Sequence, residues 1–171
     1  FVESKAFKIA IVPSADRSTG GGTPKTTNSN YWGKGFTWIT PSDMSSYTKF
    51  INNSKKNITE KGLKSSSAKL VEPNSIIISS RAPIGYVLIN QKEVCTSQGC
   101  KSFTPLLKST LNIEYVYYYL LAIIDDLKKR ATGTTFAEIS GSEFGETIIL
   151  IPPVLEQLRI VNKIRVLENF I

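Results

Sequence analysis

Short apolar runs in the first two-thirds of the chain predict strands, and helical periodicity follows them. Residues 75–79, Ser-Ile-Ile-Ile-Ser, have the β-branched density of a buried strand. The other expected strands cover residues 6–12, 36–40, 86–90, 93–103 (with a turn at 97–99) and 147–151. Residues 46–72 are polar and rich in Asn and Ser, so loops and at most one short helix are expected there.

Two helices are predicted in the last third of the chain. From about residue 112 to residue 130, apolar residues recur at i, i+3, i+4 and i+7, so one face is buried, and Asn112 suits the N-cap. The second helix starts at Pro152-Pro153, where the second proline fits the first helical turn. A narrow seam typical of a helix that pairs with another helix is formed by Ile160, Ile164, Leu167 and Ile171. The same spacing also fits a helix that docks on its own domain.

These elements predict an α+β fold. Residues 1–150 form a compact, irregular, β-rich body with one packed helix, and residues 151–171 begin a projecting helix. A chain of 171 residues suits one domain with such an element. No apolar run is long enough to span a bilayer, and no leader for secretion is apparent, so a cytoplasmic protein without membrane contact is expected.

Charge is unevenly distributed along the chain. Residues 1–110 carry 15 Lys and Arg against 6 Asp and Glu, a net charge of +9, whereas residues 111–171 carry 6 against 8, a net charge of −2. The first part therefore favours a polyanionic partner, and the second suits a protein partner. Lysines scattered over an ordinary protein surface are the alternative interpretation.

The residues of the common catalytic sites are missing. There is no histidine, so the commonest general base and zinc ligand is absent. The loop with Gly20-Gly21-Gly22 lacks the Gly-Lys-Ser/Thr ending that a nucleotide-binding loop needs. Cys95 and Cys100 are too few for a disulfide framework and are expected to be buried free thiols. We therefore predict no catalytic residue and no metal site.

Cations and hydroxyls occupy many of the loops in the basic half. Lys25, Lys34, Arg81 and Lys101 lie in or next to glycine- or proline-bearing turns. Such cations reach phosphates, and an arginine can also bind a guanine edge through two hydrogen bonds. Each of these residues alone also fits a plain surface position.

Six segments, in this order, resemble the target-recognition domain of the specificity subunit of Type I restriction–modification enzymes. They are Gly21-Gly22-Thr23-Pro24; Tyr31-Trp32-Gly33 leading to Trp38-Ile39-Thr40-Pro41-Ser42-Asp43; Arg81-Ala82-Pro83-Ile84-Gly85; Ser97-Gln98-Gly99-Cys100-Lys101; Gly133-Thr134-Thr135-Phe136-Ala137-Glu138-Ile139-Ser140; and Ile151-Pro152-Pro153-Val154-Leu155-Glu156-Gln157. Each motif is weak alone, but the ordered set covers nearly the whole chain.

The resemblance implies a non-catalytic reader of double-stranded DNA. The implied DNA-binding residues are Gly21, Gly22, Thr23, Lys25, Thr40, Ser42, Ser80, Arg81, Gln98 and Lys101. The implied subunit-interface residues are Glu156, Gln157, Ile160, Ile164, Leu167 and Ile171. Trp38 is expected in the core rather than against a base.

The same resemblance implies the partners and the cofactors. The partners are methyltransferase (modification) subunits, a translocating restriction subunit and a second recognition domain bound through the spacer helix. S-adenosylmethionine, ATP and magnesium belong to the partner subunits, so no cofactor is expected on this chain. A recognition domain within a fused restriction–methyltransferase chain, or a protein-interaction module that does not bind DNA, are the alternatives.

Overall fold

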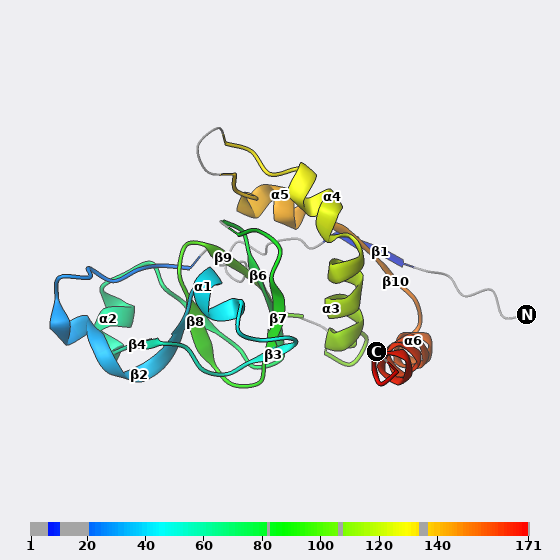
Figure 1. The fold of residues 1–171 in the computed structure, drawn as a ribbon, viewed down its shortest axis with the longest axis horizontal. Coiled ribbons are helices and arrows are strands. Elements are labelled where there is room, and N and C mark those ends of the chain that lie inside the picture. Colours follow the sequence, from blue (N-terminus) through cyan, green and yellow to red (C-terminus); the bar gives the residue numbers. More distant parts are fainter. Residues whose placement is uncertain (1–6, 11–20, 82, 106–107, 134–136, 171) are drawn as a thin grey trace, which may run out of the picture.

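The computed structural model describes residues 7–10, 21–81, 83–105, 108–133 and 137–170. Three sheets and a set of short helices follow one another along the long axis, and α6 lies near the end opposite β2 (Figure 1). Gly20, Thr134 and Ile171, named in the sequence-based predictions, lie outside the described residues. The mixture of helices and strands confirms the predicted α+β class.

Two four-stranded sheets form the body. The first has the strand order β4 (Lys56–Ile58), β2 (Trp32–Ile39), β8 (Val94–Thr96) and β5 (Leu70–Val71). The second has the order β3 (Phe50–Ile51), β7 (Val87–Asn90), β6 (Ser75–Ser79) and β9 (Cys100–Phe103). In each sheet one pair is parallel, β2–β8 and β3–β7 respectively, and the other pairs are antiparallel.

A third sheet joins the two ends of the chain. β1 (Phe7–Ala10) pairs antiparallel with β10 (Ile148–Ile151), with Phe7 opposite Ile151. The strand expected at residues 6–12 is described at residues 7–10, and the final expected strand is confirmed. The pairing of these two strands was not predicted, because strand partners far apart in sequence leave no local pattern.

Side-chain alternation divides the core into three clusters. Ile76 and Ile78 of β6 face the helices. Ile77 points the other way and packs with Leu88 of β7 against Ile39 of the first sheet. On the outer side of the first sheet, a third cluster contains Trp38, Ile58, Ala68 and Cys95. The second sheet is therefore buried on both faces, which explains why all five residues of β6 are buried and why its centre, residues 76–78, is continuously apolar rather than alternating with charges.

The helices are short except for two. In chain order they are η1 (Ser29–Tyr31), α1 (Pro41–Met44), α2 (Glu60–Lys64), α3 (Ile113–Ala122), α4 (Ile124–Lys129), α5 (Gly141–Gly145) and α6 (Val154–Glu168). Asn112 caps α3 as predicted, accepting hydrogen bonds from the amides of Glu114 and Tyr115.

The prediction of a single helix from residue 112 to residue 130 is wrong in one respect: the structure has two helices there, α3 and α4. Ile123 has φ −104° and ψ 11°, which ends α3 and begins α4. Its amide still donates to the Tyr119 carbonyl at 3.2 Å and is shared with the Leu121 carbonyl, so the break lies in the backbone angles of this one residue. The apolar spacing persists across the break because Leu120 and Leu127 enter the same cluster. Periodicity therefore could not reveal the change of direction.

Two of the short helices begin with capping boxes. In α1 the Thr40 side chain accepts from the Asp43 amide while Asp43 accepts from Thr40, and in α5 Ser140 and Glu143 do the same. The sequence pattern Ser/Thr-x-x-Asp/Glu was present at both places and would have identified the two starts. Each helix is one turn long, so apolar periodicity gave no signal.

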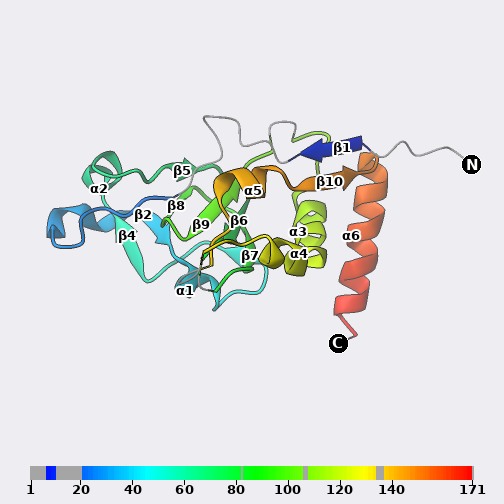
Figure 2. The same ribbon diagram turned by 90° about the horizontal axis from the view of Figure 1, so that it is seen from above.

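The C-terminal helix lies beside α3 (Figure 2). Val161 is buried, and Ile160 packs against the cluster that contains the α3 side chains. Leu155, Leu158, Val166, Leu167 and Phe170 are exposed instead. α6 therefore has one covered face and one open face, and the open apolar stripe shares Leu167 with the seam predicted from the sequence, whereas Ile160 and Ile164 are half-buried.

Candidate nucleic-acid interface

Most of the predicted DNA-contacting segments meet at the turn between β8 and β9, residues 97–99, which we call the Gln98 turn. The Thr23 hydroxyl donates a hydrogen bond to Gln98 Oε1, and the Ser80 amide donates to the Gly99 carbonyl at 2.8 Å. A Cβ on Gly99 would lie 2.9 Å from Pro41 Cγ, so this turn packs closely on the start of α1. Three segments separated in sequence therefore surround this turn and the start of β9 that follows it: residues 21–23, 40–43 and 80–81.

The predicted DNA-contacting residues differ in exposure. Lys25, Ser42, Arg81 and Gln98 are exposed; Thr23, Thr40 and Lys101 are half-buried; Gly21, Gly22 and Ser80 are buried. An exposed side chain is available to a ligand, whereas a buried one shapes the backbone that carries its neighbours. The structure brings these residues together around the Gln98 turn, except for Lys25, whose carbonyl accepts a hydrogen bond from Trp32 at the start of β2. Their contacts with DNA stay predictions.

The glycine loop packs against protein backbone. The Gly22 amide donates to the Thr96 carbonyl at 2.9 Å, and the Gly22 carbonyl accepts from Trp38 Nε1 at 2.8 Å. A Cβ on Gly21 would lie 2.1 Å from the Ser97 carbonyl oxygen. These glycines therefore lie close against the backbone of the same chain. Trp38, which is 7% exposed, is in the core as predicted.

We expect Gly22→Ala to lower the free energy of unfolding by about 1–3 kcal/mol, the range for overpacking an interior. A Cβ at Gly22 would lie 2.0 Å from the Ala68 amide nitrogen, which is backbone and cannot rotate away. Urea denaturation measures the change. Gly141→Ala is the matched control, because a Cβ there meets nothing within 4 Å. Equal stability of the two variants would contradict this packing role.

Thr40 is engaged in its helix cap. Its hydroxyl donates to Asp43 Oδ2 at 2.6 Å, and its amide donates to the same oxygen at 3.0 Å. Asp43 Oδ1 also accepts the amide of Lys55 at 3.0 Å. The buried Asp43 thus holds the Thr40 turn in place, and Ser42 is presented on the exposed side of α1.

Two of the predicted cations bind one carboxylate. Arg81 Nε lies 2.8 Å from Glu138 Oε2, and Lys101 Nζ lies 3.1 Å from Glu138 Oε1. Burial acts to raise the pKa of Glu138, but the hydrogen bonds from Arg81 and Lys101 outweigh it and hold the pKa below its usual value. Together, Arg81, Lys101 and Glu138 carry a net charge of +1. Sequence reasoning did not select Glu138, and nothing local connects it to residues 57 and 37 positions away.

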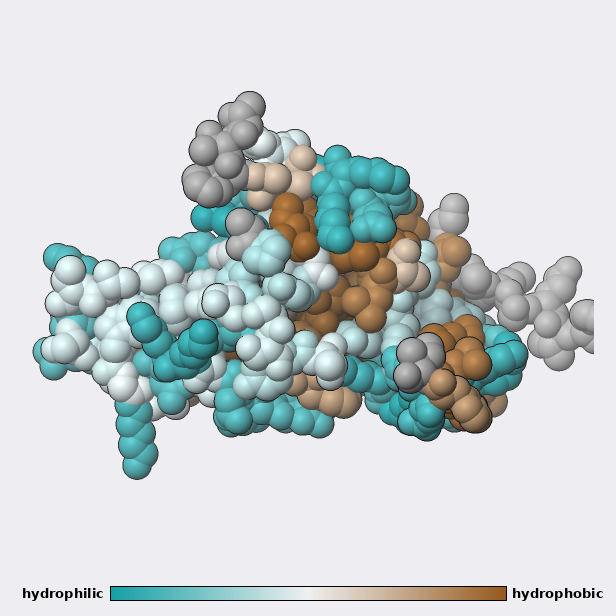
Figure 3. Space-filling model, in the orientation of Figure 1, coloured by the Kyte–Doolittle hydropathy of each residue, from teal (hydrophilic) through white to brown (hydrophobic). Residues whose placement is uncertain are grey.

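A second group of lysines lies where β2 begins. Residues 33–35 form an irregularity in the β2–β4 pairing, in which both Trp32 and Phe36 are opposite Ile58. Lys34 at its centre is exposed. Lys56 Nζ lies 5.5 Å from the Trp32 ring centroid, and Trp32 Nε1 donates to the Lys25 carbonyl at 3.3 Å. This end of the molecule, which includes α2, shows a mainly polar surface, whereas apolar side chains gather near α3 and α6 (Figure 3).

The predicted subunit-interface residues fall on different faces of α6. Gln157 is fully buried: its Oε1 accepts from the Asn112 amide at 2.8 Å, and its Nε2 donates to the carbonyls of Thr110 and Pro152. The side chain therefore serves its own domain, which corrects the prediction for this residue. Glu156 pairs with Arg159 on the same helix. Of the four seam residues, Ile160 and Ile164 are half-buried, Leu167 is 56% exposed, and Ile171 is not described.

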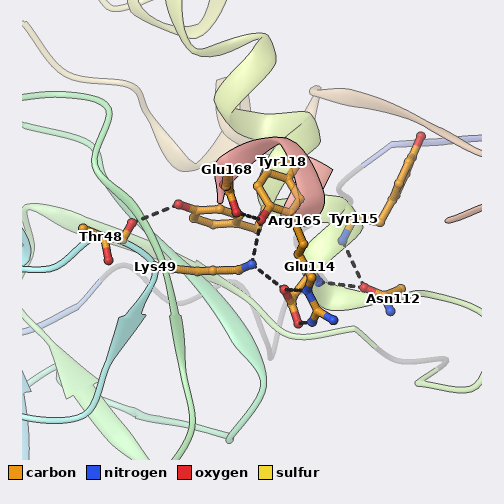
Figure 4. A network of polar contacts seen from close by, with 9 residues as sticks. Thr48, Lys49, Asn112, Glu114, Tyr115, Tyr118, Arg165 and Glu168 are labelled. Atoms are coloured by element: carbon orange, nitrogen blue, oxygen red, sulfur yellow. Dashed lines mark hydrogen bonds and ion pairs between the residues drawn. The ribbon is translucent and has the colours of Figure 1, made fainter. Parts of the chain in front are cut away.

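Ion pairs around Glu114 link three segments of the chain (Figure 4). The Glu114 carboxylate on α3 pairs with Lys49, just before β3, and with Arg165 on α6. Lys49 Nζ also donates to the Tyr118 hydroxyl at 2.8 Å, and Tyr118 donates to Glu168 at 2.8 Å. Burial acts to raise the pKa of Glu114, but the bonds from Lys49 and Arg165 hold it below its usual value. This network fixes α6 to the body.

The remaining chemistry of the described residues is sparse. Cys95 and Cys100 are free and buried, as predicted, and burial raises the pKa of each thiol to about 12. Such thiols stay protonated and are poor nucleophiles and metal ligands. Among the described residues, no group of His, Cys, Asp and Glu is suited to a metal ion, and no helix is long and apolar enough to cross a membrane.

Fold and sequence together define a DNA-specificity module. The chain belongs to the family of the Type I restriction modification DNA specificity domain, whose sequence profile matches residues 15–171. It is 36% identical over 170 residues to the Type I restriction enzyme MjaIX specificity subunit of Methanocaldococcus jannaschii, a match that covers 98% of this chain and 39% of that protein.

Solved structures show the same fold. The HsdS subunit from Thermoanaerobacter tengcongensis matches with a TM-score of 0.71 and 18% identity, covering 96% of this chain and 37% of that one. The S subunit of a Type I restriction–modification system from M. genitalium matches with a TM-score of 0.61 and 17% identity, covering 99% and 40%. The chain thus spans about two-fifths of the length of these relatives.

Proposed function

We propose that this chain recognises a specific sequence of double-stranded DNA as the target-recognition part of a Type I specificity subunit and is itself non-catalytic. One observation carries the proposal: the exposed polar groups of Ser42, Arg81 and Gln98 surround one turn in the basic part of a chain of this family. Exposed hydroxyl, amide and guanidinium groups are those that read base edges, and the surrounding lysines supply phosphate contacts.

The proposed partners follow from the same assignment. Methyltransferase subunits would bring S-adenosylmethionine, and a translocating restriction subunit would bring ATP and magnesium, all in the cytoplasm. The open stripe of α6, with Leu155 81% and Leu167 56% exposed, supports pairing with the spacer helix of a second recognition domain. The relatives reported above are named as specificity subunits, which favours this assignment over a fused enzyme chain.

The test uses the full-length subunit assembled with its methyltransferase partners. Methylome sequencing defines the target, and fluorescence anisotropy then measures binding to target and scrambled duplexes over a range of salt concentrations. We expect specific binding whose affinity falls steeply with salt. Arg81→Ala should weaken target binding about 10- to 100-fold, the range for an arginine that reads a base. Lys129→Ala on α4, exposed and paired with Asp126, is the control.

Three outcomes would contradict parts of the proposal. Equal affinity for target and scrambled DNA would reject sequence recognition by the complex. Unchanged binding and methylation in Arg81→Ala would reject the site. The helix contact is tested separately with Leu155→Lys in the same subunit, which should weaken the pairing of the spacer helices in sedimentation experiments. Unaltered pairing would reject the contact.

A further inference from the structure

Arg81 is held by a carboxylate that another cation already neutralises. Lys101 Nζ lies 3.1 Å from Glu138 Oε1, and its side chain is only 14% exposed. Glu138 therefore has a charge partner without Arg81, whose side chain is 50% exposed. An ordinary surface ion pair contributes about 0–1 kcal/mol to stability, so stability alone is a weak reason for the pair between Arg81 and Glu138.

Glu138 is fixed by backbone on both sides of the site. Its amide and carbonyl exchange hydrogen bonds with Thr132 at 2.8 and 3.0 Å, and the Ile139 amide donates to the Ser80 carbonyl at 3.1 Å. Ser80 in turn donates to Gly99 at 2.8 Å. The carboxylate and the backbone of Arg81 thus belong to one hydrogen-bonded frame that includes the Gln98 turn.

The carboxylate occupies only one edge of the guanidinium. Within the described part of the chain, Arg81 uses Nε for its hydrogen bond to Glu138. With respect to the described residues, both terminal nitrogens then remain for a ligand, and two parallel donors in a plane match the O6 and N7 acceptors of guanine. A guanidinium already held in one orientation loses less conformational entropy when it binds.

We propose that Glu138 is a positioning residue for DNA recognition, which orients Arg81 so that its terminal nitrogens bind the major-groove edge of a guanine. The proposal rests on the proposed function and adds to it the base that is read and a residue that acts through another. Glu138 itself makes no contact with the base. Lys101 keeps the carboxylate ionised, so that Glu138 acts only as an acceptor.

The experiment uses the full-length subunit with its methyltransferase partners and the target defined by methylome sequencing. Each guanine of this domain's half-site is replaced in turn by 7-deazaguanine, which lacks the N7 acceptor. We expect wild type to lose affinity about 10-fold or more at one position. Arg81→Ala should bind both duplexes equally. Glu138→Ala should show the same loss of discrimination while it retains binding to scrambled DNA.

Two further variants separate positioning from a structural role. Glu138→Gln keeps an acceptor for Nε and should restore part of the discrimination. The double variant Arg81→Ala/Glu138→Ala should match Arg81→Ala alone, because Glu138 acts through Arg81. Glu60→Ala is the control, since that exposed glutamate pairs with Lys64 away from the Gln98 turn.

The outcomes distinguish this inference from the proposed function. If wild type binds its target specifically but Glu138→Ala keeps full discrimination, only the positioning role is overturned. If no guanine position is sensitive to 7-deazaguanine, or if Arg81→Ala weakens target and scrambled DNA equally, Arg81 binds phosphate and the inference is also overturned. If wild type shows no sequence preference at all, the proposed function itself fails.

Discussion

Gln157→Leu is expected to lower the free energy of unfolding by about 1–3 kcal/mol, because it removes the hydrogen bonds of a fully buried amide to three backbone groups. Gln157 is 0% exposed and serves the Asn112 amide and the carbonyls of Thr110 and Pro152. Leucine fills the space but takes away all three of these hydrogen bonds. Urea denaturation monitored by circular dichroism measures the loss.

The matched control lies on the same helix. Asn162→Leu changes an exposed amide to leucine and should alter stability by less than about 0.5 kcal/mol. Gln157→Glu should also lower the free energy of unfolding. Glutamate keeps the acceptor for the Asn112 amide but loses the donors to two carbonyls and buries a charge. A Gln157→Leu protein as stable as Asn162→Leu would show that the side chain does not join α6 to the start of α3.

Glu114→Gln is expected to destabilise the chain by about 2–3 kcal/mol near neutral pH, below the 3–5 kcal/mol of a fully buried pair. The reduction reflects solvent access: the side chains of Lys49, Glu114 and Arg165 are 17%, 16% and 51% exposed. The variant removes the carboxylate shared by both cations. Hydrogen exchange should also rise along α6, because Arg165 then loses its partner on α3.

The pH dependence has a defined sign. The folded-state pKa of Glu114 lies below its ordinary value of 4.5, so the stability it contributes is present above that pH and is lost as the pH falls through the folded-state pKa. The pKa of Lys49 is raised above 10.5, so its contribution is lost only as the pH rises through that higher value. Denaturation at several pH values should therefore show a shallower acid decline in Glu114→Gln than in wild type. Identical slopes would contradict the coupling.

The exposed Glu60–Lys64 pair on α2 provides the control for this experiment. The pair lies one turn apart on α2, and its side chains are 72% and 73% exposed. Glu60→Gln should leave the stability at neutral pH and the exchange rates of α6 unchanged. A comparable increase in α6 exchange would mean that loss of any carboxylate, rather than the link to α3, loosens the helix.

Local signals were sufficient where neighbouring residues determine the structure. The β-branched run at residues 75–79 forms β6 with the predicted bounds, and Asn112 caps α3. The capping-box patterns of α1 and α5 were present in the sequence but were not used to predict these helices. For the glycine loop, the sequence did not show that the atoms approaching Gly21 belong to Thr96 and Ser97, or that those approaching Gly22 belong to Ser67 and Ala68.

The candidate site was only partly predictable for the same reason. Arg81, Gln98 and Lys101 were selected as polar groups in turns, and the structure places them around one turn. Glu138, which holds two of these three residues, was missed because its role arises from a contact over 57 positions. The role of the seam on α6 stays a prediction, and a helical spacing defines faces but not which of them its own domain covers: Ile160 and Ile164 are half-buried, whereas Leu167 is exposed.

The sequence by itself determined the α+β class, the basic first part and the lack of histidine chemistry. Those properties follow from composition and from interactions between near neighbours. The tertiary structure decided which glycines are buried, which face of α6 stays open, and that Arg81 and Lys101 share Glu138. These depend on packing between distant segments, whose partners are selected by the shape and charge of the whole fold rather than by any local pattern.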